Sequence, residues 1–180
     1  MEPRFTIRVY GLLLHHGSVL VSDELIKGQR ITKFPGGGLE FGEGLKDCLI
    51  REIREEIGVE ALDVHHFYTT DFFQQSTFHN TPMQVVSVYY TFRVADPAAI
   101  PVVTAPFTGI NGPGDQEVFR WWRIEGGREE DLSLPIDKVV WGMVAGPFRG
   151  MNHGCLVLKR VTGPDRGNTQ GLEAGSPRRF

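Results

Sequence analysis

The sequence lacks the features that define several protein classes. Its 180 residues include only two cysteines, Cys48 and Cys155, which match no metal-ligand spacing. We expect both to be reduced; one disulfide between them is the alternative. No apolar run approaches the roughly 20 residues of a membrane-spanning helix, and the N-terminus lacks the basic region and cleavage site of a secretion signal. These absences favour a soluble, cytoplasmic protein with no membrane partner.

Basic residues are not in excess either. The chain has 19 Lys and Arg against 22 Asp and Glu, which gives a formal net charge of −3. Proteins that bind nucleic acid usually carry a basic excess, so we expect no nucleic-acid partner. A local basic site for a small phosphorylated ligand is compatible with this composition. The hydrophobic fraction of 41% and the length are enough for one domain with a substantial core.

The pattern of apolar and turn-forming residues predicts several strands and two helices. Strands are expected at 5–14, 19–25, 64–75, 83–95 and 117–125, with helices at 45–57 and 134–146 and turns at 15–18 and 26–30. This order favours a mixed sheet with helices packed against it, an α/β class, over a strict doubly wound fold.

Two segments are not expected to form regular structure. Residues 96–116 hold four prolines and three glycines and are predicted to be a long irregular loop, which could serve as a lid or contact the substrate. A small strand is expected at 155–160, and residues 161–180 are poor in large apolar residues and are expected to be disordered. The predicted domain is therefore 1–160.

The sequence FPGGGLEFGEGLKDCLIREIREEIGVE, residues 34–60, places three glutamates on one side of the predicted helix. On a helical wheel Glu52, Glu55 and Glu56 share an arc of roughly 100°. Like charges at this spacing repel, so arginines, open water or a bound cation must compensate. An i,i+4 pair with Arg51 explains Glu55. It does not explain Glu52 and Glu56, which lie in line with leucines and for which a site for a hard cation such as Mg²⁺ is the alternative.

The same segment resembles the signature of the Nudix hydrolase family, G-x5-E-x7-R-E-U-x-E-E-x-G-U, where U is aliphatic. Gly37, Glu43, Arg51-Glu52-Ile53, Glu55-Glu56 and Gly58-Val59 occupy all of its fixed positions, and Phe34-Pro35-Gly36 is similar to the family's usual lead-in. Nine defined positions over residues 37–59 make the match specific, although it covers only about an eighth of the chain. The resemblance implies an α/β/α sandwich with a mixed β-sheet.

The resemblance also implies roles for these residues. Glu52, Glu55 and Glu56 would hold Mg²⁺ or Mn²⁺, and Gly37 would offer its backbone carbonyl to the metal. Arg51 would orient the glutamates, and Glu43 would support the metal site or the substrate. Either Glu52 or Glu56 would be the general base.

Residues outside the signature are further candidates. Glu117 precedes a tryptophan-containing strand, where the family tends to place another metal-binding acid; an exposed strand-entry residue is the alternative. Arg8 and Lys33 are candidates for binding phosphates, with ordinary surface charge as the favoured reading. Phe72, Phe73, Tyr89 and Trp121 could stack on a base, although core packing is the more usual role of such aromatic residues.

The resemblance implies metal-dependent hydrolysis of a pyrophosphate bond in a nucleoside diphosphate linked to another moiety. The substrate would be a nucleotide sugar, an ADP-ribose-like compound or a nucleoside triphosphate. A non-catalytic module that senses nucleotides is the alternative, but such relatives often lose signature glutamates and this chain has lost none. Family members often form homodimers; no residue here identifies a dimer surface.

Overall fold

A computed structural model of the chain describes residues 2, 4–76, 82–112, 114 and 116–149. The expected strand at 155–160, the tail at 161–180 and Cys155 lie outside these residues. In chain order the elements are β1 (Arg4–His15), β2 (Ser18–Ile26), β3 (Gln29–Lys33), β4 (Gly36–Gly38), α1 (Leu45–Ile57), β5 (Leu62–Thr69), β6 (Met83–Arg93), η1 (Pro97–Ala99), β7 (Gln116–Arg123), η2 (Glu129–Asp131) and α2 (Pro135–Arg149). Within this part of the chain, no helix has the length and apolar character needed to cross a membrane.

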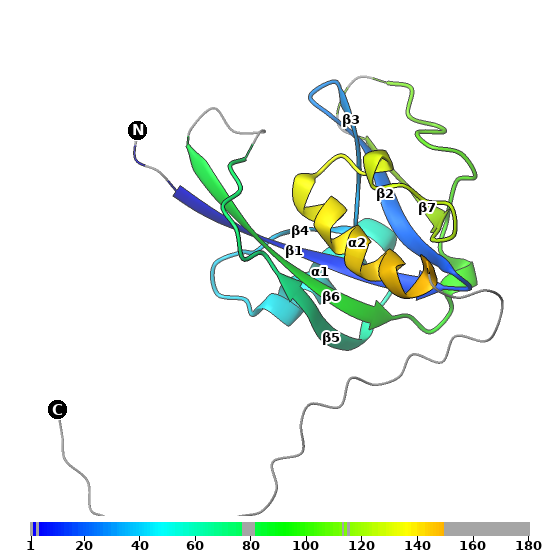
Figure 1. The fold of residues 1–180 in the computed structure, drawn as a ribbon, viewed down its shortest axis with the longest axis horizontal. Coiled ribbons are helices and arrows are strands. Elements are labelled where there is room, and N and C mark those ends of the chain that lie inside the picture. Colours follow the sequence, from blue (N-terminus) through cyan, green and yellow to red (C-terminus); the bar gives the residue numbers. More distant parts are fainter. Residues whose placement is uncertain (1, 3, 77–81, 113, 115, 150–180) are drawn as a thin grey trace, which may run out of the picture.

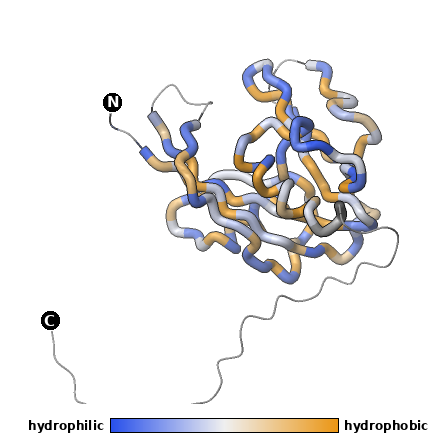
Figure 2. The backbone as a smooth tube through the Cα atoms, viewed as in Figure 1, coloured by the Kyte–Doolittle hydropathy of each residue, from blue (hydrophilic) through white to orange (hydrophobic). Residues whose placement is uncertain are grey.

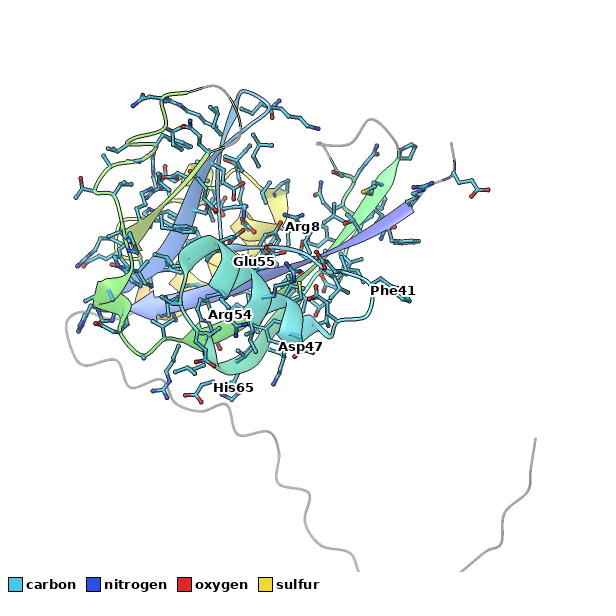
Figure 3. The ribbon with its side chains drawn as sticks, turned by 180° about the vertical axis from the view of Figure 1, so that it is seen from behind. Arg8, Phe41, Asp47, Arg54, Glu55 and His65 are labelled. Atoms are coloured by element: carbon cyan, nitrogen blue, oxygen red, sulfur yellow. The ribbon has the colours of Figure 1, made fainter. Side chains whose placement is uncertain are left out.

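The strands form one mixed, seven-stranded sheet. Its main order is β3-β2-β1-β6-β5, with β4 paired to β1 and β7 paired to β2. Strand β1 pairs in parallel with β6 and antiparallel with β2 and β4. Figure 1 shows α2 on one face of the sheet, and Figure 3, from behind, shows α1 on the other. The predicted α/β/α sandwich is confirmed.

Two hydrophobic cores lie on opposite faces of the sheet because successive strand residues point to opposite sides. On β1, Val9 and Leu13 pack in the core with α1, whereas Tyr10 and Leu12 pack in the core with α2. Strand β6 divides in the same way. Figure 2 shows hydrophobic residues recurring along these strands, whereas the tip of the β2–β3 turn is hydrophilic. The long central strands are thus covered on both faces.

Helix α1 has the predicted bounds. Its buried residues Cys48, Leu49, Ile53 and Ile57 form the stripe that faces the sheet. Gly58 ends the helix with φ 78°, a left-handed conformation that glycine adopts without steric cost, and its N–H donates to the Arg54 carbonyl. The sheet-facing stripe fixes which side of α1 presents its glutamates to the glycine-rich β4.

Several predicted boundaries were wrong. The strand expected at 64–75 is β5, which runs from Leu62 to Thr69: its last ladder pair is Thr69 with Val88, and beyond it only an isolated bridge joins Gln75 to Gln84. Phe72 and Phe73 beyond it are 39% and 68% exposed, so they are not core residues. The turn expected at 26–30 is shorter, since the β2–β3 ladder still pairs Ile26 with Gln29.

The long loop between β6 and β7 is tied to the sheet by the buried side chain of Asp23. Its carboxylate accepts hydrogen bonds from Arg120 Nε at 2.6 Å, from Thr32 Oγ1 at 2.6 Å and from the backbone N–H of Phe107 in the loop at 3.3 Å. Asp23 is fully buried and the Arg120 side chain nearly so. This network holds β2, β3, β7 and the loop together beside the site described below.

A second buried carboxylate, Asp137 of α2, gives a test based on pH. It accepts hydrogen bonds from Tyr89 Oη at 2.6 Å and from the Phe34 N–H at 3.3 Å. Burial raises its pKa from 3.8 to about 7. The folded protein therefore keeps a proton that the unfolded chain has lost, so this contribution to stability is present below about pH 4 and is lost as the pH rises towards 7.

We expect Asp137→Asn to remove this dependence. The unfolding free energy of the wild type minus that of the variant should fall between pH 4 and 7, by on the order of a few kcal/mol. Urea denaturation at a series of pH values measures it. Asp71→Asn is the matched control, because Asp71 also accepts a hydrogen bond from a tyrosine, Tyr68, but at the surface. An equal fall for both variants would contradict the prediction.

Candidate metal and substrate site

Strand β4 allows α1 to approach β1 closely because it consists of three glycines. A Cβ on Gly37 would lie 2.2 to 2.4 Å from the carboxylate atoms of Glu52. A Cβ on Gly36, which has φ 127°, would lie 2.2 Å from the Val9 carbonyl oxygen. The Gly36 N–H donates to Glu56 Oε2 at 2.9 Å. The glycines thus place two of the signature glutamates directly against the backbone of the loop.

Gly37→Ala tests this close approach. The added methyl group must displace the Glu52 carboxylate, which is the end of a flexible side chain, so the fold should survive. We expect activity to fall about 10- to 100-fold, as when a positioning contact of a metal site is lost. Thermal denaturation and steady-state kinetics on the same sample separate the two effects. A large loss of melting temperature with unchanged kinetics would refute this assignment.

The acidic cluster of the site consists of Glu24 of β2, Glu56 of α1 and Glu117 of β7. One carboxylate oxygen from each lies within 4.8 Å of the others. Glu24 and Glu117 are direct partners in the β2–β7 ladder. Ser22 Oγ donates to Glu117 Oε1 at 2.5 Å and lies 3.1 Å from Glu24 Oε1. Three hard oxygen donors at this separation fit a divalent cation such as Mg²⁺ or Mn²⁺.

The electrostatics of the cluster also fit a cation. Burial, and then the Glu56 charge, raise the pKa of Glu117 to about 8. Burial likewise raises the pKa of Glu56, against the opposing effects of Lys33 and the Gly36 hydrogen bond. Crowded carboxylates that hold protons near neutral pH release them when a cation binds. The free protein therefore favours a partly protonated cluster.

Lys33 is the cation beside this cluster. Its Nζ lies 2.6 Å from Glu24 Oε1 and donates to the Gly36 carbonyl at 3.0 Å. Burial disfavours the charged ammonium, but the carboxylates of Glu56 and Glu24 outweigh it and raise the lysine pKa. Lys33 is 4% exposed, so it is not the ordinary surface charge favoured from the sequence.

Arg51 of α1 forms ion pairs with the three other glutamates of the signature. Its guanidinium lies 2.7 Å from Glu43, 3.0 Å from Glu52 and 3.1 Å from Glu55, and also donates to the Gly38 carbonyl. The hydrogen bonds from Arg51 lower the pKa of Glu43 to about 2. The expected i,i+4 pair with Glu55 is confirmed. Arg51 therefore links the loop before α1 to the helix itself.

Figure 3 shows the outer side of α1, from which Asp47, Arg54 and Glu55 project. The Glu55 side chain is 60% exposed, whereas that of Glu52 is 13% exposed beside Gly37. The structure thus brings Glu56 and Glu117 together, holds the Glu52 side chain against Gly37, and leaves Glu55 at the surface.

Two cavities lie beside the site: Lys33 of the first contacts Glu24 of the acidic cluster, and two cluster residues border the second. The first, the Lys33 cavity, has a volume of about 240 Å³ and lies between the sheet and the start of α2, with Arg8, Tyr10, Lys33, Tyr89 and Ile136 in its lining. Arg8 Nε donates to Tyr10 Oη at 3.3 Å. The second, the Val102 cavity, has a volume of about 340 Å³ and lies between α1, β7 and the long loop. Glu56 and Glu117 border this second cavity.

Sequence reasoning missed two residues of the site. Glu24 belongs to the cluster, and Ser22 contacts two of its carboxylates. The available signal was the pair Asp23-Glu24 inside a largely apolar predicted strand, since buried carboxylates are costly unless they are paired or bind a cation. Of the aromatic candidates, Tyr89 lines the Lys33 cavity and is also fully buried core. Trp121 is half-buried, with its ring centroid 5.4 Å from that of His15.

Comparisons with known proteins identify the family and the fold. The family model described as NUDIX domain matches residues 4–136. A solved NUDIX hydrolase from Nitrosomonas europaea is 16% identical, covering 79% of this chain and 90% of its own, with a TM-score of 0.55. The MutT NUDIX hydrolase from Burkholderia pseudomallei is 15% identical over 78% of this chain and 98% of its own, with a TM-score of 0.54. A MutT protein from Methanosarcina mazei Go1 is 17% identical over 84% of this chain and 99% of its own, with a TM-score of 0.53. These structures share the fold.

Proposed function

The chain belongs to the Nudix family of pyrophosphohydrolases, and from this premise we propose that it hydrolyses a nucleoside diphosphate linked to another group in a metal-dependent reaction. The linked group is either a sugar-like moiety or a further phosphate. The observation that carries the proposal is the cluster of Glu24, Glu56 and Glu117 between two cavities, with the buried Lys33 beside it.

The carboxylates of the cluster are the proposed ligands for Mg²⁺ or Mn²⁺, together with the signature glutamates Glu52 and Glu55 and the Gly37 carbonyl. A bound ion would neutralise charge on the pyrophosphate and lower the pKa of a bound water. Water attacks one phosphorus, the bridging P–O bond breaks, and the water's proton passes to a carboxylate, for which Glu56 and Glu52 are the candidates. Two phosphate monoesters, or a monophosphate and pyrophosphate, are the products.

The remaining charged residues bind the phosphates of the substrate or orient a metal-binding glutamate. Lys33 and Arg8, at the wall of the first cavity, offer their cationic groups to the phosphates, where buried hydrogen-bonding cations are most effective. Arg51 holds Glu52 in place through its 3.0 Å contact. The tyrosine and aliphatic side chains of the Lys33 cavity offer an uncharged surface to a nucleoside.

A hydrolysis screen in which the products are separated and identified tests the proposal. Purified full-length protein is incubated with Mg²⁺ or Mn²⁺ and with nucleotide sugars, ADP-ribose, dinucleoside polyphosphates and nucleoside triphosphates. We expect turnover of at least one class that stops when EDTA removes the metal. Tight nucleotide binding without turnover under any of these conditions would overturn the proposal and favour a nucleotide-sensing module.

A further inference from the structure

The Val102 cavity differs in chemistry from the cluster that it adjoins. Apart from Glu56 and Glu117 its lining is apolar, consisting of Ile57, Pro101, Val102, Val103, Val118 and Phe119. Among the described residues, no lysine or arginine contributes to it. Its volume of about 340 Å³ lies within the range of small-molecule sites. The cavity therefore suits an uncharged group that lies next to a metal-bound phosphate.

The cavity is held open by fixed elements. Pro101 to Val103 come from the long loop, and the Val103 N–H donates to the Phe119 carbonyl of β7 at 2.8 Å. Asp23 ties the same loop to β2 and β7 through Phe107 and Arg120. The long loop thus forms one wall of a built site beside the cluster, as a substrate-contacting loop would.

Each cavity has two charged side chains in its lining, and in each case at least one of them belongs to the cluster or contacts it. In the Lys33 cavity the cations are Arg8 and Lys33, of which Lys33 is paired with Glu24; the rest of the lining is apolar or uncharged. In the Val102 cavity the charged groups are the cluster carboxylates themselves. A ligand that fills both cavities therefore has an uncharged group at each end and its charge in the middle.

We infer that the substrate is a nucleoside diphosphate whose terminal phosphate is esterified with an uncharged, largely apolar group, and that the Val102 cavity binds that group. This inference rests on the proposed function and narrows it. A nucleoside triphosphate carries its charge at one end. With its nucleoside in the Lys33 cavity and its inner phosphates at the metal, the terminal phosphate would face the apolar side chains of the Val102 cavity, whose described lining offers it no lysine or arginine.

The experiment compares substrates that differ only at this end. The benzyl esters of ADP, GDP, CDP and UDP at the β-phosphate are assayed with Mg²⁺ or Mn²⁺ against the corresponding triphosphates. Hydrolysis gives a nucleoside monophosphate plus benzyl phosphate in one case and pyrophosphate in the other. For at least one base we expect kcat/KM for the ester to exceed that for the triphosphate by about tenfold or more, the discrimination typical of an apolar subsite.

A charge placed in the cavity should weaken or remove this preference. Val102 is 41% exposed, so Val102→Lys introduces an ammonium group at the cavity wall without burying it in the core. The ratio of ester to triphosphate kcat/KM should fall about tenfold. Val139→Lys on α2, where the valine is 39% exposed and lines neither cavity, is the matched control and should leave the ratio unchanged. Val102→Ala is a second variant that should lower kcat/KM for the ester alone.

The outcomes separate this inference from the proposed function. Metal-dependent turnover that favours the triphosphates, or an unchanged ratio in both Val102 variants, would overturn the inference and leave the proposed function standing. Absence of turnover for every ester and every triphosphate with either metal would overturn the inference, and the proposed function would fall with it only if the nucleotide sugars, ADP-ribose and dinucleoside polyphosphates were not hydrolysed either.

Discussion

Glu56→Gln is expected to lower kcat for metal-dependent hydrolysis by about 100-fold or more. Glu56 is a carboxylate of the cluster with Glu24 and Glu117, and either role proposed for it, metal ligand or general base, requires an ionised oxygen. The glutamine retains a carbonyl oxygen that can accept the hydrogen bond of the Gly36 N–H, so the loop should stay in place. Steady-state kinetics with Mg²⁺ and Mn²⁺ measure the loss.

The same substitution should raise thermal stability in the absence of metal. The pKa of Glu56 is raised because burial and neighbouring carboxylates disfavour its ionised form, so a neutral amide relieves an unfavourable interaction at neutral pH. Glu60→Gln, an exposed glutamate just beyond α1, is the control and should change neither property. A Glu56 variant that is less stable and retains full activity would refute its place in the site.

Asp23→Asn is expected to destabilise the fold by about 3–5 kcal/mol, the usual cost of leaving one partner of a buried ion pair uncompensated. The variant keeps the shape of the side chain but leaves the Arg120 guanidinium, 2.6 Å away, without an opposing charge. It also weakens the hydrogen bonds from Thr32 and Phe107. Urea denaturation followed by circular dichroism gives the unfolding free energy.

An exposed ion pair on the same part of the molecule provides the comparison. Arg123 and Glu125 lie 3.6 Å apart with side chains 68% and 79% exposed. Glu125→Gln should therefore cost only about 0–1 kcal/mol. If Asp23→Asn were no more costly than Glu125→Gln, the buried network would not be what anchors the long loop.

Local sequence patterns predicted the elements whose partners lie within a few residues. Helix α1 was predicted with its observed bounds because Leu45, Leu49, Ile53 and Ile57 recur every four residues and Gly58 ends the helix. The strand expected at 83–95 is β6, whose Val88 and Tyr90 lie in one core and Tyr89 in the other, as the alternation of side chains along a strand requires. The end of β5 was not predicted, because it depends on where the pairing with β6 stops, which is after Thr69 and Val88.

The residues of the site likewise fall into those that the sequence predicted and those that only the structure revealed. The sequence by itself determined the glycine loop, Arg51 and the signature glutamates, since these lie close together along one loop and one helix. Only the tertiary structure decided that Glu24 joins Glu56 and Glu117, and that Lys33 is buried beside them. The β2–β7 ladder pairs Glu24 with Glu117, far away in the sequence. That register is set by the packing of whole strands and not by any local pattern. The two cavities likewise form only where those strands meet α1, α2 and the long loop.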